Sequence, residues 1–194
     1  ADNSWDSDES VIGLTYDGTG LGLDSAIWGG EVLIGNYTAF TRRFHLSEAP
    51  LPGADAAIRH PARIALAYLL AYGLEYPDTL APATTLCYEE RTVLRSQIEH
   101  KINTPLTTSM VRLFDAVSAL IGVRQTATYE GQAAIELEAI CDPAVMDAYS
   151  IPFETDTVLI KPLLEQIIRD WSEAIPQSII SARFHNGLAR LSVE

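Results

Sequence analysis

Asp17 stands directly before glycines at alternate positions in the stretch VIGLTYDGTGLG, which runs from residue 11 to residue 22. A carboxylate at the carboxyl end of a strand is a common way for folds of helices around a sheet to present a ligand-binding group. Gly18, Gly20 and Gly22 would let the backbone approach a ligand closely or adopt positive φ. The stretch is therefore a candidate ligand-binding turn.

A plainer interpretation of the same residues is an Asp-Gly hairpin turn at Asp17 and Gly18. The pattern does not indicate a dinucleotide site, because it lacks the third glycine at Rossmann spacing and a following helix. A serine hydrolase has no support either, since the sequence contains no G-x-S-x-G motif. The pattern alone leaves the turn and the ligand site both open.

The composition limits the kind of ligand. The chain has 194 residues, of which 47% are hydrophobic and 20% charged, as expected for one globular domain with a sizeable core. Thirteen basic residues against 26 acidic ones give a net charge of −13, so we expect no nucleic-acid partner. An anionic ligand would need local help from backbone N–H groups, arginines or a metal ion.

The cysteines, the apolar runs and the N-terminal residues indicate the cellular compartment. Cys87 and Cys141 lack C-x-x-C spacing and are predicted to be free thiols in a reducing compartment, which indicates the cytoplasm. No apolar run approaches the roughly 20 residues of a membrane span, so no membrane partner is expected. Residues 1–10 are acidic, unlike a signal peptide, and are expected to be disordered or extended.

The periodicity predicts a mixed α/β chain that leans to α+β, with short strands before a helical bundle. Residues 11–46 are predicted to be mostly β, with a strand from 11 to 17 that ends at Asp17 and later strands linked by Gly29-Gly30 and Asn36. The segment 54–194 is predicted to be mostly α. Helices are expected within residues 55–73, 89–102, 104–123, 130–142, 157–175 and 176–193, with a loop at 75–84 and an extended stretch at 149–156.

Residues that commonly begin or end helices support these predicted helix boundaries. Asp55 is the expected N-cap of the first helical run, Pro61 should begin or kink the helix, and Gly73 should end it. The run at 104–123 is apolar at 110, 113, 114, 117, 120 and 121, positions that are predicted to face the core until Gly122 ends the helix.

Four stretches read together resemble one family. DGTGLGLDSAIWGGEVL, LPGADAAIR, INTPLTTSMVRLFDAVSALIGV and TYEGQAAIELEAI occur in the order and approximate spacing of the C-terminal, Kae1-like part of the HypF carbamoyltransferases of nickel-iron hydrogenase maturation. The resemblance runs from about residue 11 to residue 191 and is weak at 74–100 and 142–175. It implies a partial domain of the actin-like ATPase (ASKHA, Kae1-like) architecture, and therefore a fragment or a reduced relative.

The resemblance also implies an activity. Such enzymes bind adenine nucleotide between their lobes and move a carbamoyl group from carbamoyl-adenylate to the C-terminal cysteine of a HypE-type maturation protein. The product is later dehydrated to the cyanide ligand of the [NiFe]-hydrogenase. Carbamoyl-adenylate is made from carbamoyl phosphate and ATP by domains that precede this segment in the family, so this chain alone is expected to be inactive.

One metal ligand is implied. In the family a divalent metal (Zn, Fe or Mg) is held by a His-x-x-x-His segment, by the aspartate of the D-G-x-G block and by an aspartate in a G-D-G-G block. Of this set only Asp17 is present here. A single carboxylate should hold a metal weakly at best.

The blocks SMVRLFDAV and TYEGQAAIELEA imply a nucleotide site. Asp115 matches an aspartate on the ribose, and a carboxylate can accept hydrogen bonds from two hydroxyls. Ser109 and the free N–H groups of the first helical turn favour polar or anionic ligand atoms. Arg112 pairs either with phosphate oxygens or with a surface carboxylate. Gly131 would approach the nucleoside beside Glu130, although a helix-start carboxylate explains Glu130 almost as well.

Four charged side chains are candidates for lining a substrate channel, namely Glu31, Asp55, Arg59 and Arg63. Glu31 follows a glycine pair that allows close approach. Asp55 and Arg59 have a plainer explanation as a helix cap and a salt bridge.

The sequence departs from the family pattern near these residues. After Arg59 the family usually has Glu-Pro-Trp-Arg, whereas His60 and Ala62 replace the carboxylate and the aromatic side chain here. Ala54 replaces the second glycine of L-P-G-G-D, and Val111 replaces a glycine where a β-branched side chain could crowd a nucleotide.

Two function classes follow from the sequence. The first is a segment of a HypF-type carbamoyltransferase, and the second is a catalytically inactive lobe or degenerate paralogue that acts as a binding or interaction module. Antibiotic O-carbamoyltransferases and tRNA threonylcarbamoyl-transfer proteins fit less well, because LFDAVSALIG and YEGQAA favour the HypF type and the acidic pI argues against tRNA. A homodimer through the apolar surface of an uncovered lobe is a further expectation.

Overall fold

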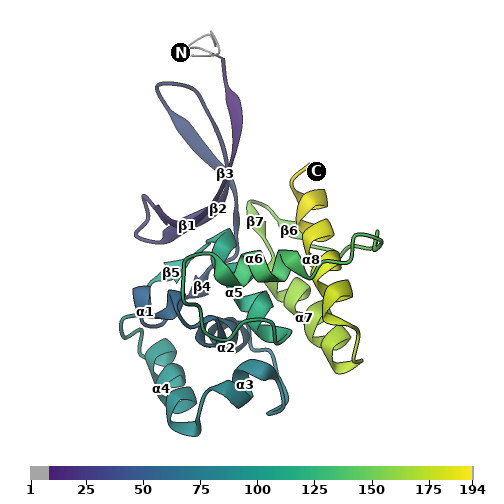
Figure 1. Cartoon of the computed structure of the whole chain (residues 1–194). Coiled ribbons are helices and arrows are strands. Elements are labelled where there is room, and N and C mark those ends of the chain that lie inside the picture. Colours follow the sequence, from purple (N-terminus) through teal and green to yellow (C-terminus); the bar gives the residue numbers. More distant parts are fainter. Residues whose placement is uncertain (1–8, 194) are drawn as a thin grey trace.

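The computed structural model describes residues 9–193, so the expectation for residues 1–8 lies outside the described residues. Strands come first along the chain, and helices follow (Figure 1). The longer strands are β1 (Val11–Leu21), β2 (Ile27–Gly35) and β3 (Phe40–Leu46), followed by the short β4 (Ala49–Pro50). The predicted order of strands before helices is confirmed.

Seven of the described strands form one sheet in the order β4-β5-β2-β3-β7-β6, and β1 pairs with β2. The pairs β1–β2 and β2–β3 are antiparallel, while β5 (Leu106–Thr107) runs parallel to β2, and β7 (Thr157–Val158) runs parallel to β3. The remaining strand is β6 (Phe153–Glu154). Part of β1–β3 extends as an arm away from the helical body (Figure 1).

Strand β1 does not end at Asp17, which corrects the prediction. Tyr16 pairs with Gly30 and Gly20 pairs with Trp28, so the three residues from Asp17 to Thr19 stand opposite a single residue of β2. Such an insertion is a β-bulge, which bends a strand without ending it. The chain reverses later, where the Gly22 N–H donates to the Ala26 carbonyl at 3.2 Å, so the predicted Asp-Gly hairpin turn is also wrong.

Gly29 and Gly30 lie inside β2 and do not link two strands as predicted. A Cβ on Gly29 would lie 2.2 Å from the Asp17 carbonyl oxygen, and one on Gly30 would lie 2.3 Å from the Thr108 carbonyl oxygen. Both contacts are with backbone, so neither position has room for a side chain. The glycine pair therefore lets β2 run between the bulge of β1 and residue 108.

The helices begin with the single turn α1 (Asp55–Ile58) and continue with α2 (Pro61–Ala71), α3 (Ala81–Thr85), α4 (Tyr88–Glu99), α5 (Met110–Leu120), α6 (Gln132–Ala139), α7 (Ile160–Ser172) and α8 (Gln177–Leu191). Helices α2 and α5 are almost entirely buried and contribute much of the hydrophobic core. Pro61 occupies the first turn of α2, and Gly73 and Gly122 have positive φ after α2 and α5, as predicted for residues at helix boundaries.

Several predictions in the helical part are wrong. The helices expected from residues 104 and 157 begin at Met110 and Ile160, because the first residues of both segments join the sheet as β5 and β7. Asp55 is the first residue of α1 and not its N-cap, which is Ala54 at φ 47° without a capping side chain. The loop predicted at residues 75–84 contains the start of α3, whose Pro82 lies in the first turn, where its missing N–H costs nothing. Short helices of this kind give little periodicity in the sequence.

Cys87 and Cys141 are free thiols, as predicted. Within residues 9–193 no helix has the length and apolarity needed to cross a membrane. Large apolar side chains are exposed on β1 and in the reversal that follows it, including Ile12, Leu21 and Leu23. Association through this surface stays a prediction.

Candidate functional site

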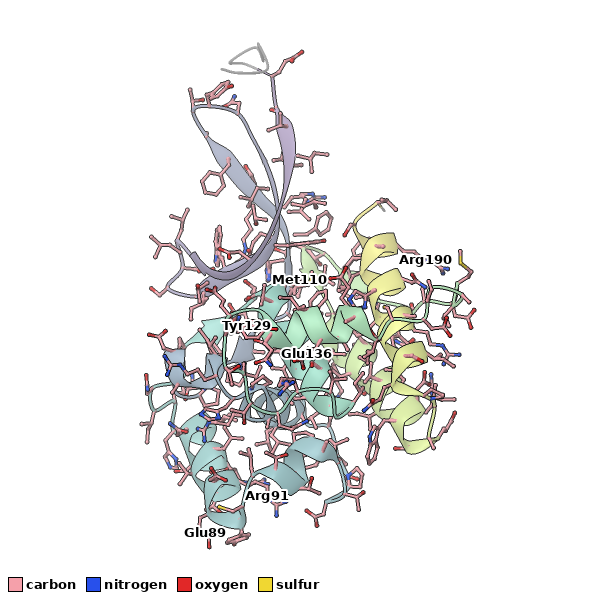
Figure 2. All side chains as sticks on the ribbon, viewed as in Figure 1. Glu89, Arg91, Met110, Tyr129, Glu136 and Arg190 are labelled. Carbon is pink, nitrogen blue, oxygen red and sulfur yellow. The ribbon has the colours of Figure 1, made fainter. Side chains whose placement is uncertain are left out.

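Polar side chains gather where the β1 bulge, the start of β2 and the N-terminus of α5 meet. Figure 2 shows Met110, the first residue of α5, at the base of the strand arm. We call this group the α5 cluster. Its members are Asp17, Glu31, Thr108, Ser109, Arg112 and Asp115.

Ser109 joins the bulge to the helix. Its hydroxyl oxygen accepts a hydrogen bond from the Arg112 backbone N–H at 3.3 Å, which makes Ser109 the N-cap of α5. The same hydroxyl donates to the Asp17 carbonyl oxygen at 2.5 Å. The N-cap therefore also fixes the backbone of the bulge.

Arg112 lies against the inner side of the bulge. Its side chain is only 2% exposed, and its Nη2 atom lies 3.4 Å from the position that a Cβ on Gly18 would take. The Cβ of Val111 lies 3.8 Å from that same position. The guanidinium group of Arg112 and the side chain of Val111 therefore lie within van der Waals reach of the backbone next to Asp17.

Arg112 forms a buried ion pair with Asp115, with 3.0 Å between Nη1 and Oδ2. Asp115 is 3% exposed, and burial raises its pKa to about 6, although the charge of Arg112 opposes this shift. Among the described residues, Nε and Nη1 of Arg112 and Oδ2 of Asp115 have no partner with hydrogen-bond geometry. The pair thus keeps unused hydrogen-bonding capacity beside the bulge.

The Asp17 carboxylate is exposed. Its Oδ1 atom accepts a hydrogen bond from the Gly18 N–H at 2.6 Å, and its second oxygen has no hydrogen-bond donor within residues 9–193. Residues 9–193 contain no group of three or more His, Cys, Asp or Glu side chains that could hold a metal ion. Asp17 supplies one carboxylate, and this donor set alone does not fit a metal site.

Glu31 is held inside the protein. Its side chain is 1% exposed, and Oε2 accepts hydrogen bonds from the backbone N–H groups of Gly29 at 2.6 Å and Gly30 at 2.8 Å. Oε1 accepts from Arg42 at 2.8 Å and from the hydroxyl of Thr108. Four donors surround this carboxylate, so it fixes the start of β2, and its predicted role in a substrate channel stays a prediction.

Arg42 is a central residue that sequence reasoning missed. It donates to Asp24 at 3.0 Å, to Glu31 at 2.8 Å and to Thr108 at 3.2 Å, and its guanidinium lies 4.2 Å from the centre of the Trp28 ring. These partners lie 11 to 66 residues away along the chain. No local pattern could have revealed contacts over such separations.

Glu130 and Gly131 stand before α6. Gly131 is the N-cap at φ 76°, which favours glycine, and Glu130 is exposed without a side-chain partner among the described residues. The loop is braced by Arg124, whose Nε and Nη2 atoms each lie 2.6 Å from a carboxylate oxygen of Glu136. Figure 2 shows Tyr129 in this loop and Glu136 on α6.

The other predicted channel residues do not touch the α5 cluster. Asp55 and Arg59 are exposed on and just after α1, and neither forms an ion pair within residues 9–193. Arg63 on α2 donates to the Gln97 side chain of α4 at 2.7 Å. The predicted salt bridge between Asp55 and Arg59 is therefore absent from the described part of the chain.

The chain is related to known proteins over most of its length. The family described as "Carbamoyltransferase, Kae1-like Domain, second subdomain" matches residues 13–194. The chain belongs to this HypF carbamoyltransferase family. The resemblance noted in the sequence is thereby confirmed.

Individual HypF proteins agree with the family match. Carbamoyltransferase HypF2 of Cupriavidus necator is 42% identical over 140 residues, which is 70% of this chain and 16% of that protein. Carbamoyltransferase HypF of Synechocystis is 34% identical over an alignment of 206 positions, gaps included, that covers 96% of this chain and 26% of that protein.

Solved HypF structures share the fold. The crystal structure of full-length HypF in the phosphate- and nucleotide-bound form matches with a TM-score of 0.85 and 38% identity, over 96% of this chain and 29% of that one. The T. kodakarensis HypF structure matches with a TM-score of 0.74 and 28% identity, over 94% of this chain and 25% of that one. The chain thus spans less than a third of these relatives, and its fold is that of a partial Kae1-like domain.

Proposed function

We propose that this chain is the segment of a HypF-type carbamoyltransferase that holds part of an adenine nucleotide site. In the whole enzyme, carbamoyl-adenylate bound there would give its carbamoyl group to the C-terminal cysteine of a HypE-type maturation protein. ATP and carbamoyl phosphate would supply the carbamoyl-adenylate. The proposal places the protein in the cytoplasm, where its two free thiols suit a reducing environment.

The main support is the position of Arg112 under Gly18. In a chain of net charge −13, an anionic ligand needs local donors, and the guanidinium lies directly behind an exposed bulge with Nε and Nη1 unpartnered, while Asp115 offsets part of its charge. The N-terminus of α5 points to the same place and adds the positive end of its helix dipole. Phosphate groups would therefore lie over the bulge, and the nucleoside would lie towards Gly131 and Glu130.

Asp17 would face the same phosphates. Its free carboxylate oxygen could complete a divalent metal site whose other ligands lie outside residues 9–193. Asp115 would act mainly through Arg112, since it is buried and pairs with that guanidinium. Direct contact between Asp115 and a ribose would require the N-terminus of α5 to move.

A second candidate function is a binding module without catalysis. Val111 favours this second function. The family pattern has a glycine at position 111, whereas the Val111 side chain here lies beside Gly18. A β-branched side chain there narrows the space beside the bulge. Replacing Val111 with glycine should therefore strengthen nucleotide binding if the site is only partly degenerate.

Calorimetric titration with ATP, with and without Mg²⁺, tests the proposal. We expect binding in the millimolar range or tighter, weakened at least about tenfold by Asp115→Asn, because the loss of the carboxylate disturbs the position of Arg112. Glu138→Gln on the exposed face of α6 is a matched control that should bind like the wild type. Circular dichroism would verify that each variant is folded.

Absence of binding in the wild type and in Val111→Gly would refute a nucleotide site in this chain. Binding that appears only in Val111→Gly would favour the inactive module. Equal affinity of the wild type and Asp115→Asn would show that the buried pair plays no part in binding.

A further inference from the structure

The helical part of the chain contains a polar cavity that shares no lining residue with the α5 cluster. It has a volume of about 320 Å³ and lies between α7, α8 and the segment 147–149. Three of the 13 basic residues of the chain line it, namely Arg169, Arg183 and Arg190. Figure 2 shows Arg190 on α8, near the C-terminal end of the helix.

The walls of this cavity are fixed by side chains that bind backbone. Asn186 donates to the carbonyl oxygens of Val145 and Asp147 at 2.9 Å each. Gln166 accepts from the Ser150 N–H at 3.1 Å and donates to the Ser150 carbonyl oxygen at 2.8 Å. The segment is thus attached to α8 at one end and to α7 at the other, so the cavity is preformed.

Its floor is a buried carboxylate that is already paired. Oδ2 of Asp170 accepts from the Tyr149 hydroxyl at 2.8 Å and from Nη1 of Arg183 at 2.6 Å. The other terminal nitrogen of Arg183 lies 3.5 Å from Oδ2 of Asp147, whose side chain is 77% exposed. Arg183 is therefore anchored on one side and only loosely paired on the other.

The other two guanidinium groups lack a close carboxylate. Arg169 is 62% exposed, and its shortest ion-pair distance is 3.9 Å, to Asp170. Arg190 donates one hydrogen bond, to the Met146 carbonyl oxygen at 2.9 Å, and forms no ion pair within residues 9–193. Three guanidinium groups and two carboxylates therefore line the cavity, which leaves it with a net charge of about +1.

We propose that this cavity binds a phosphate group. Guanidinium groups from three positions on two helices can each donate to a different oxygen of a tetrahedral anion, whereas a carboxylate could use only part of this set. The carboxylate of Asp147 competes with the phosphate for Arg183, because a bound phosphate would take the place of this exposed carboxylate beside the guanidinium group. The volume admits a phosphate monoester as well as free phosphate, and the site is independent of the proposed nucleotide site.

Nuclear magnetic resonance of the arginine Nε–H groups gives a direct test. The ¹⁵N-labelled chain is titrated with inorganic phosphate and, separately, with methyl phosphate, against sodium chloride at the same ionic strength. We expect the signals of Arg169, Arg183 and Arg190 to shift with one shared dissociation constant. Tighter binding of methyl phosphate would identify a monoester as the ligand, and tighter binding of free phosphate would identify the free ion.

Three variants locate the site. Asp147→Asn should tighten binding about threefold or more by removing the competing charge, and Arg190→Gln should weaken it about fivefold or more. Arg95→Gln on the exposed face of α4 makes the same change of charge outside the cavity and should leave affinity within about twofold of the wild type. Arg183 is left intact because its loss would leave Asp170 buried without its cation.

Shifts no larger than those in chloride would overturn the proposal. Equal weakening by Arg190→Gln and Arg95→Gln would overturn it too, because it would show that only the overall charge matters. Unchanged or weaker binding by Asp147→Asn would contradict the role of Asp147 as the competitor and with it the proposed position of the phosphate.

Discussion

Replacing Glu31 with glutamine should strongly destabilise the fold. The carboxylate accepts two backbone N–H groups on one oxygen, and Arg42 and the hydroxyl of Thr108 on the other. A glutamine amide has only one accepting oxygen. Its NH₂ group must therefore face at least two of these donors.

The cost can be worked from these contacts. Each lost hydrogen bond to a charged group is worth about 1.5–3 kcal/mol, so two lost bonds give about 3–6 kcal/mol. Arg42 keeps its bond to Asp24 and its contact with Trp28, which places the expected loss towards the lower end of that range. A loss of about 4 kcal/mol is a large part of the stability of a typical domain.

Urea denaturation followed by far-ultraviolet circular dichroism measures this loss. With a slope of about 2 kcal/mol per molar urea, the midpoint should fall by about 2 M. Glu138→Gln makes the same chemical change at an exposed position and should stay within about 0.5 kcal/mol of the wild type. A loss below about 1 kcal/mol for Glu31→Gln would refute the structural role of Glu31 and favour the substrate channel instead.

Three further predictions concern the site and its supports. The folded-state pKa of Asp115 is raised to about 6 from 3.8, so the free energy of unfolding should fall by on the order of 3 kcal/mol as the pH rises from about 3 to about 7, and Asp115→Asn should lack this fall in urea titrations. Gly29→Ala would place a Cβ 2.2 Å from the Asp17 carbonyl oxygen and should lower the urea midpoint by well over 1 M, whereas Gly13→Ala, with its nearest atom at 4.0 Å, should change it little. A double-mutant cycle on Arg124 and Glu136 should give a small favourable coupling energy that declines with salt.

Each of these predictions has a clear contrary result. Parallel pH profiles for the wild type and Asp115→Asn would show that the Asp115 pKa is not raised. Equal midpoints for the two glycine variants would contradict the tight crossing of β1 and β2. A coupling energy of zero at low salt would show that the ion pair does not brace the loop before α6.

Much of the helical part could be predicted because its signals are local. Pro61 and Gly73 mark the ends of α2 within a residue or two, and Gly122 follows α5 as expected. Ser109 was singled out beside the correct helix start. The effects of these residues depend on local backbone preferences, so the sequence around each residue is enough to predict them.

The strand region was harder to predict because its geometry depends on pairing. Asp17 and Gly18 are typical of a turn, yet the opposing strand draws them into a bulge and moves the reversal to residues 22–26. The partners of Glu31 include Thr108, 77 residues away. Arg112 is buried beside Gly18, which is 94 residues away along the chain, so a sequence motif could propose its chemistry but not its position.

The most direct test of the nucleotide site is to map ATP onto the chain. Backbone amide signals of the ¹⁵N-labelled protein are followed during titration with ATP and Mg²⁺. We expect the amide signals of Gly18, Ser109 and Gly131 to shift together with one dissociation constant. Shifts confined to the cavity of Arg183 and Arg190, or none at all, would contradict the claim that the β1 bulge and the N-terminus of α5 hold the nucleotide.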